Sequence, residues 1–304
     1  MAEVHHFTYG AFNPIAAFLL AFVGSFFGLL STGRARKAHT RGRRNRWLVI
    51  AAFAIGGGAV WLMHFAAMLG FDVPASPVRY DLTLTLVSLV VAVVPVGAGL
   101  MVVGHDRRGP ARVITAGTLT GLGLLAMHYT GMRGLHVAGA VHYRPALVAA
   151  SALIAVVAAT LALWFTVALK GWGPVTGAAA LMAFAVCGLH YTGMAAMRVE
   201  LDPAPTGVSG IRPLLIIVPI MLLTAVITVG LALSALQAMT EEEFTDGGAV
   251  PRRRMHAEPW TLRQAPVPVV RRTPGPRPSP RPVPRRPVPA EPRATAGAAG
   301  STAV

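Results

Sequence analysis

The hexapeptide MHYTGM at residues 127–132 returns as LHYTGM at residues 189–194, and a related MHFAAM stands at residues 63–68. The histidines of successive copies are 64 and 62 residues apart, and a valine follows each histidine nine residues later. A period of this length covers two membrane-spanning helices with their loops. The chain therefore contains three sequence repeats, each of which ends on the hexapeptide.

The composition indicates a polytopic membrane protein. Hydrophobic residues make up 54% of the 304 residues and charged residues 13%, with a mean hydropathy of +0.58. Uncharged apolar stretches of about 20 residues, the length that crosses a bilayer, occupy residues 11–31, 47–70, 82–104, 113–132, 146–169, 174–197 and 213–237. The first is too long for a signal-peptide core and its basic residues follow it, so we expect it to be retained.

The fold class that follows is all-α and integral to the membrane, with seven transmembrane helices. Spans 1–2, 3–4 and 5–6 form three two-helix repeats, and span 7 is unpaired. Because each repeat crosses the membrane twice, all three run in the same direction, which predicts a pseudo-threefold axis along the bilayer normal. Small residues beside the motifs would let the motif helices approach one another; they are Gly56, Gly57, Gly58, Gly117, Gly121, Gly123, Ala178, Ala179 and Ala180.

The short loops predict the orientation. The loop STGRARKAHTRGRRNR after span 1 holds seven lysines and arginines, and the loop after span 3 holds three. The alternating loops hold one or two each. Since basic loops stay in the cytoplasm, we expect the N-terminus outside, the C-terminus in the cytoplasm and the three motifs near the outer face.

The chain changes character at about residue 241, so we expect a membrane domain over residues 1–240 and a tail over residues 241–304. From residue 250 onward, eleven arginines interleaved with proline face two glutamates, a net charge of +9. This composition predicts a disordered segment. We expect it to contact anionic lipid headgroups beside the membrane, and we do not expect nucleic acid as its partner, because a basic tail alone specifies none.

The motif histidines are the candidate metal ligands. Of ten histidines only these three lie within the predicted spans, which contain no Asp, Glu, Lys or Arg, and an ionisable group in a membrane usually marks function. Each has a methionine four residues later on the same helix face. Imidazole with soft thioether favours copper as Cu(I), with one position open to a small molecule. The candidate ligands are His64, Met68, His128, Met132, His190 and Met194.

Several neighbouring residues are secondary candidates. Met63 and Met127 point about 100° away from the histidines on a helix. Tyr129 and Tyr191 fit interfacial aromatics, and the following Thr-Gly pairs fit helix packing. Cys187 lies one turn before His190; as a lone cysteine it excludes an intramolecular disulfide and a multi-cysteine metal site.

Over about residues 8–240 the sequence resembles the MHYT domain, a bacterial membrane sensor module named for the tetrapeptide that stands here at residues 127–130. The resemblance implies a plasma-membrane sensor that binds copper through the motif His and Met residues and responds to a diatomic gas such as O2, CO or NO. The sequence departs from the pattern at Phe65, where tyrosine would stand, and at Leu189, where methionine would stand.

Members of that family often carry a cytoplasmic diguanylate cyclase or phosphodiesterase. The residues after position 240 are too few and too proline-rich for one, so we expect no enzymatic activity and an output through an unknown cytoplasmic signalling protein. Three other interpretations stay open: a copper transporter, which would need polar groups stepping across the membrane; a haem protein; and a purely structural role for the histidines.

Overall fold

The computed structural model describes residues 4–5, 7–8, 10–105, 109–202 and 207–215, with scattered further positions as far as residue 233. The chain divides into two units, Met1–Val250 and Pro251–Val304. All described residues belong to the first unit, and the predicted tail lies outside them.

Among the described residues, six helices are long and apolar enough to cross a membrane, and they coincide with the first six predicted spans. The second is continuous over Arg41–Met68 but has three parts, because its middle winds as a π-helix. The elements are α1 (Phe12–Lys37), α2 (Arg41–Ala52), the π-helix η1 (Phe53–Leu62), α3 (Met63–Met68), α4 (Leu82–His105), α5 (Pro110–Arg133), α6 (Pro145–Ala168) and α7 (Trp172–Ala196). The seventh predicted span, residues 213–237, falls mostly outside the described residues; its described positions have helical backbone.

The outer faces of these helices are apolar and exposed. Val90 and Val94 of α4, Leu153 of α6, and Leu181 and Phe184 of α7 each leave about half or more of their surface uncovered. A soluble protein would bury such side chains, whereas in a bilayer they face lipid. The chain is therefore a multi-pass membrane protein.

The described carboxylates all lie at one end of the helices, and most of the described lysines and arginines lie at the other. The described carboxylates are Asp72, Asp81, Glu200 and Asp202, and all four lie at the end that carries the motifs. At the opposite end, α1 extends past its apolar stretch through Arg34 to Lys37, and α2 begins at Arg41. The helices are longer than the apolar stretches at this basic end because arginine and lysine form helix well and can reach the interface.

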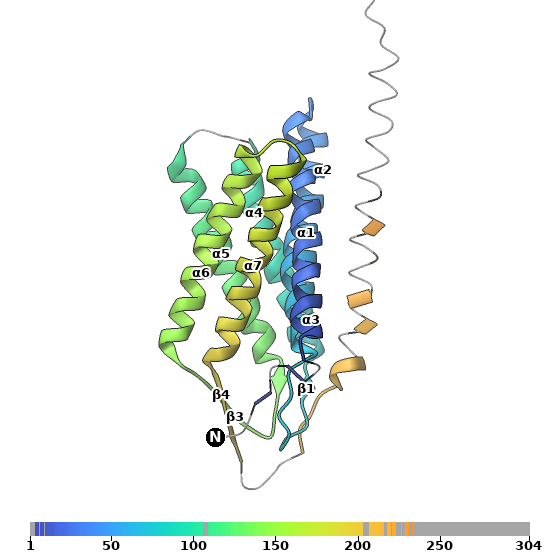
Figure 1. Ribbon diagram of the computed structural model, residues 1–304, viewed down its shortest axis with the longest axis vertical. Coiled ribbons are helices and arrows are strands. Elements are labelled where there is room, and N and C mark those ends of the chain that lie inside the picture. The colour runs from blue at the N-terminus through green and yellow to red at the C-terminus, as the bar shows by residue number, and fades with distance from the viewer. Residues whose placement is uncertain are drawn as a thin grey trace, which may run out of the picture. The chain divides into compact units, whose positions relative to one another are not determined.

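The described residues are mostly helical, as the all-α prediction requires, and four short strands among them add a small β component to the loops at the motif end. Strand β1 (Arg79–Tyr80) pairs antiparallel with β2 (Leu135–His136), and β3 (Gly139–Tyr143) pairs antiparallel with β4 (Met197–Leu201). In Figure 1 the labelled strands β1, β3 and β4 lie at the same end of the helices as α3. We call this layer the β-cap.

The cap pairings follow one rule. In each case, the segment before the first helix of a predicted pair bonds to the segment after its motif helix: β1 to β2 around α4–α5, and β3 to β4 around α6–α7. Around α1 and the second span, the equivalent contact is a single bridge between His5 and Asp72. A further bridge joins Tyr80 to Ile211. The same closure thus recurs at all three motifs.

Glycines bring the spans into close contact. A Cβ added at Gly56 would lie 2.7 Å from the Ala92 carbonyl oxygen of α4, and one at Gly121 would lie 2.7 Å from the Ala155 carbonyl oxygen of α6. Such distances leave room only for glycine. The close neighbours at these two glycines are non-motif helices, whereas we expected the motif helices to approach one another there.

Candidate metal centre

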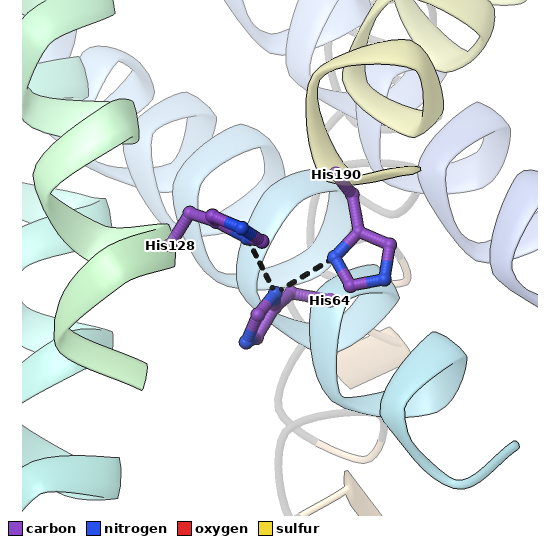
Figure 2. A group of neighbouring side chains, drawn as sticks. All are labelled: His64, His128 and His190. Atoms are coloured by element: carbon purple, nitrogen blue, oxygen red, sulfur yellow. Dashed lines mark hydrogen bonds between the residues drawn. The ribbon is translucent and has the colours of Figure 1, made fainter. Parts of the chain in front are cut away.

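The three motif histidines meet at one point although they come from three separate helices. His64 on α3, His128 on α5 and His190 on α7 present ring nitrogens that all lie within 4.8 Å of one another. The Nδ1 atom of His64 is 3.0 Å from Nδ1 of His190 and 3.2 Å from Nδ1 of His128. Figure 2 shows the three rings converging, with His64 between the other two. The predicted convergence at one depth is confirmed.

The cluster is buried and short of hydrogen-bond partners. The three side chains are 1%, 1% and 3% exposed for His64, His128 and His190. Nε2 of His64 and Nε2 of His128 are buried without a hydrogen-bond partner among the described residues. A buried polar nitrogen without a partner is costly and unusual in a native fold. The site therefore concentrates nitrogen donors in the buried interior, and two of these nitrogens are left without a partner among the described residues.

The Nδ1 contacts constrain the protons. Each imidazole nitrogen carries either one N–H or one lone pair, and Nδ1 of His64 faces two other Nδ1 atoms. Without a bound cation, one proton must stand in each contact to prevent lone pairs from facing each other. A single metal ion would satisfy all three lone pairs at once, because neutral imidazole is a metal ligand through either nitrogen.

The motif glycines lie against the histidine of another motif. A Cβ on Gly131 would be 2.9 Å from Nε2 of His64, and a Cβ on Gly193 would be 2.4 Å from Nε2 of His128. The Thr-Gly pairs are predicted to serve helix packing. The glycines do allow close packing, and the group that packs against them is the imidazole ring of a motif histidine on another helix. Each hexapeptide at residues 127–132 and 189–194 thus holds the ring of the motif before it.

The motif methionines are all in the buried core. Met68, Met132 and Met194 are buried, and so are Met63 and Met127. Burial alone therefore does not separate the expected ligands from the methionines predicted to point away. Coordination by Met68, Met132 and Met194 stays a prediction.

The aromatic position after each histidine differs among the repeats. The ring of Phe65 is fully buried and packs 4.7 Å from that of Trp61. The Tyr129 hydroxyl is 3.2 Å from Oγ of Ser151, with either as donor. The Tyr191 hydroxyl is buried with no hydrogen-bond partner among the described residues. These rings lie edge-on to the histidines that precede them, so they line the cluster; the interfacial location of Tyr129 and Tyr191 stays a prediction.

The remaining candidates lie outside the cluster. Cys187 is a free, half-buried thiol and does not belong to the group of converging ligands. His136 bonds the Ser209 carbonyl through Nδ1 at 3.2 Å, and His142 is exposed, with Nε2 3.7 Å from a Glu200 carboxylate oxygen. Both belong to the β-cap, His136 in β2 and His142 in β3.

The β-cap is the part of the site that the sequence did not reveal. Its strongest signal was the valine nine residues after each motif histidine: Val73 and Val199 are buried, and Val199 sits in the alternating strand MRVEL.

Two tyrosines of the β-cap have raised pKa values. Burial raises the pKa of the Tyr80 phenol. Burial is the larger cause and the nearby Tyr129 the smaller one that raise the pKa of Tyr143 to about 12. Both phenols are therefore neutral at physiological pH, so the cap adds no anionic phenolate above the cluster.

The family described as "Bacterial signalling protein N terminal repeat" (MHYT) matches the chain at residues 57–116, 121–179 and 184–244, together more than half of its length. Each match begins within a motif helix, upstream of the histidine of that helix. The first two matches end within the next motif helix, and the third ends at residue 244. These units are therefore shifted by one helix from the pairs that the β-cap closes.

Curated bacterial proteins are similar over the same region. The bifunctional diguanylate cyclase/cyclic di-GMP phosphodiesterase MucR of Pseudomonas aeruginosa is 37% identical over 232 residues, which is 73% of this chain and 33% of the relative. The cyclic di-GMP phosphodiesterase NbdA of the same organism is 35% identical over 205 residues, 66% of this chain and 26% of the relative. The signaling protein YkoW of Bacillus subtilis is 26% identical over 209 residues.

The chain thus spans only a quarter to a third of the length of these relatives. No solved structure matches it. The three family matches, each containing one histidine of the buried cluster, place the chain in the MHYT family of bacterial signalling proteins.

Proposed function

We propose that the protein is a membrane sensor in which His64, His128 and His190 hold one copper ion. The observation that carries the proposal is the convergence of the three Nδ1 atoms in a buried cluster, in which Nε2 of His64 and Nε2 of His128 have no hydrogen-bond partner among the described residues. A set of neutral nitrogen donors in an apolar, water-poor site suits a borderline or soft metal.

The choice of copper rests on the donors around the cluster. The described carboxylates lie in the loops and strands of the β-cap, not among the converging ligands, so a hard cation such as Mg²⁺ or Ca²⁺ has no oxygen ligands here. Buried thioethers follow each histidine by one helical turn, and thioether selects Cu(I) over zinc. Bound Cu(I) would supply a coordination position for a small π-acceptor ligand.

The sensed ligand in this proposal is a diatomic gas, O2, CO or NO, or the redox state of the metal. The glycine contacts support this, because Gly131 and Gly193 fix two imidazole rings between helices. A change in how the rings are held would be passed directly to α5 and α7. The relatives' names associate this region with proteins of cyclic di-GMP metabolism, so we propose that the signal reaches such a system through a cytoplasmic partner, with no catalysis by the region itself.

The proposed architecture has seven spans built from three parallel two-helix repeats plus one. The recurrence of the strand closure at the three motifs supports the repeats, and the third family match, which extends to residue 244, supports a seventh span. The concentration of arginine and lysine at the end opposite the motifs supports an external N-terminus and a cytoplasmic C-terminus. In this arrangement the arginine-rich tail over residues 250–304 contacts anionic lipid.

Metal analysis of the purified full chain, with its absorption spectrum, tests the proposal. We expect one copper per chain, loss of copper in the triple variant His64→Ala/His128→Ala/His190→Ala, and retention in the matched control His142→Ala, which removes an exposed histidine of the cap. Carbon monoxide should bind the reduced protein and give an infrared band that the triple variant lacks.

Each alternative predicts a different result. An intense Soret band would identify haem, although three ring nitrogens within 4.8 Å leave little room for a macrocycle. Copper uptake by cells that express the protein would identify a transporter. Full copper content in the triple variant, or wild-type protein that takes up no Cu(I), would overturn the metal site and leave the histidines a structural role.

A further inference from the structure

We infer that a pocket at the basic end of the helices binds the headgroup of an anionic phospholipid. The pocket lies between the end of α1 and the α6–α7 connection, away from the histidine cluster, and has a volume of about 590 Å³. Its lining residues are mainly of two kinds: basic residues, which we call the rim, and apolar residues. The inference depends on the membrane location of the chain and is independent of the proposed copper site.

The charged residues of the lining are all basic. The rim consists of Arg34, Arg36, Lys37 and Lys170, and no carboxylate lines the pocket among the residues described there. The four described carboxylates, in contrast, lie at the motif end. A concave site that gathers four positive charges beside a bilayer attracts the phosphate of a lipid headgroup.

Two of the arginines are fixed in place by contacts. The Arg36 guanidinium donates to the Thr166 carbonyl oxygen, and to the Leu169 carbonyl oxygen at 2.6 Å, so it holds the last turn of α6. The Arg34 guanidinium lies over the Trp47 ring, 5.0 Å from the ring centre. Ordered cations lose less conformational freedom on binding than mobile ones, which raises affinity for a given charge.

The interior favours a lipid over a free phosphate. Leu29, Leu30, Val167 and Val175 supply an apolar wall on membrane-spanning helices. Trp172, at the start of α7, is 59% exposed and packs its ring against Phe26 at 6.1 Å, a position typical of aromatic side chains at a headgroup level. A phospholipid could place phosphate at the rim and acyl chain along this wall, whereas inorganic phosphate would use the rim alone.

Native mass spectrometry of the full chain in non-ionic detergent tests the inference. Dioleoyl-phosphatidylglycerol, dioleoyl-phosphatidylcholine and inorganic phosphate would be offered separately. The pocket variant Lys37→Gln/Lys170→Gln removes two exposed charges from the rim. Its matched control, Arg41→Gln/Arg46→Gln, removes two exposed charges from the same end outside the pocket. The tail is unchanged in both, so its lipid binding cancels in the comparison.

We expect the pocket variant to lose about tenfold in affinity for one phosphatidylglycerol and the control to lose about twofold or less. A second pair tests the apolar wall without changing charge: Leu30→Trp should weaken phosphatidylglycerol binding, and Leu19→Trp, on an exposed part of the same helix, should not. Equal losses in pocket and control variants would overturn the site. If the Leu30→Trp variant still bound inorganic phosphate, and the protein showed no preference for phosphatidylglycerol, the pocket would be a site for small anions and the lipid assignment would be wrong.

Discussion

Replacing Gly193 by alanine adds one methyl group where the histidine cluster has no room for it. The new Cβ would lie 2.4 Å from Nε2 of His128, with Cδ2 at 2.9 Å and Cε1 at 3.2 Å. To reach ordinary van der Waals contact the imidazole must move by about 1 Å. Because His128 is buried and meets His64 through Nδ1, the movement separates that pair of nitrogens.

The magnitude follows from two opposing terms. Alanine in place of a helical glycine stabilises by about 0.5–1 kcal/mol, while overpacking a core costs about 1–3 kcal/mol. We therefore expect a net loss of about 1 kcal/mol for Gly193→Ala in the metal-free protein. Gly131→Ala should cost less, since its Cβ would be 2.9 Å from Nε2 of His64. A displaced ligand typically lowers metal affinity about 10–100-fold.

The control lies on the same helix. Gly188 has nothing within 4 Å of its Cβ position, so Gly188→Ala should raise stability and leave Cu(I) affinity unchanged. Unfolding of the metal-free variants in detergent, and competition for Cu(I) with a chromophoric chelator, measure the two effects separately. If Gly193→Ala were as stable as Gly188→Ala and bound Cu(I) as the wild type does, the contact between Gly193 and the His128 ring would not exist in solution.

Changing Met68, Met132 or Met194 to leucine should lower Cu(I) affinity less than a single motif His→Ala change does, because leucine keeps the packing volume and thioether is the weaker ligand; a methionine effect as large as a histidine effect would contradict this. Topology reporters should behave as external at the N-terminus and cytoplasmic at the C-terminus, and the reverse result would move the cluster to the inner face. An isolated peptide of residues 250–304 should bind anionic vesicles without becoming helical and should dissociate as salt rises, so salt-independent binding would exclude headgroup attraction as its basis. Since the pKa of Tyr143 is raised to about 12, the folded state retains that proton, and stability should fall as pH rises from about 10 towards 12; Tyr143→Phe should remove part of this alkaline loss, and an unchanged profile would count against the burial of the phenol.

The sequence by itself determined the features that depend on neighbouring residues along the chain. Long apolar runs place the six described spans to within a few residues, because about 20 apolar residues must cross the hydrocarbon in helical form. The repetition of the hexapeptide and the equal number of crossings between copies put His64, His128 and His190 at one depth. The π-helix over Phe53–Leu62 could not be foreseen, since its apolar and glycine residues suit an ordinary α-helix equally well.

Only the tertiary structure decided how the repeats meet. A helix can rotate about its own axis without changing its apolar pattern, so the sequence does not say that Nδ1 atoms converge or that Gly193 faces the His128 ring. The β-cap is not predicted by the sequence because its strands depend on distant partners. Its paired strands, such as Gly139–Tyr143 with Met197–Leu201, are about 60 residues apart in the chain, and strands this short are stabilised by their partners rather than by their own residues.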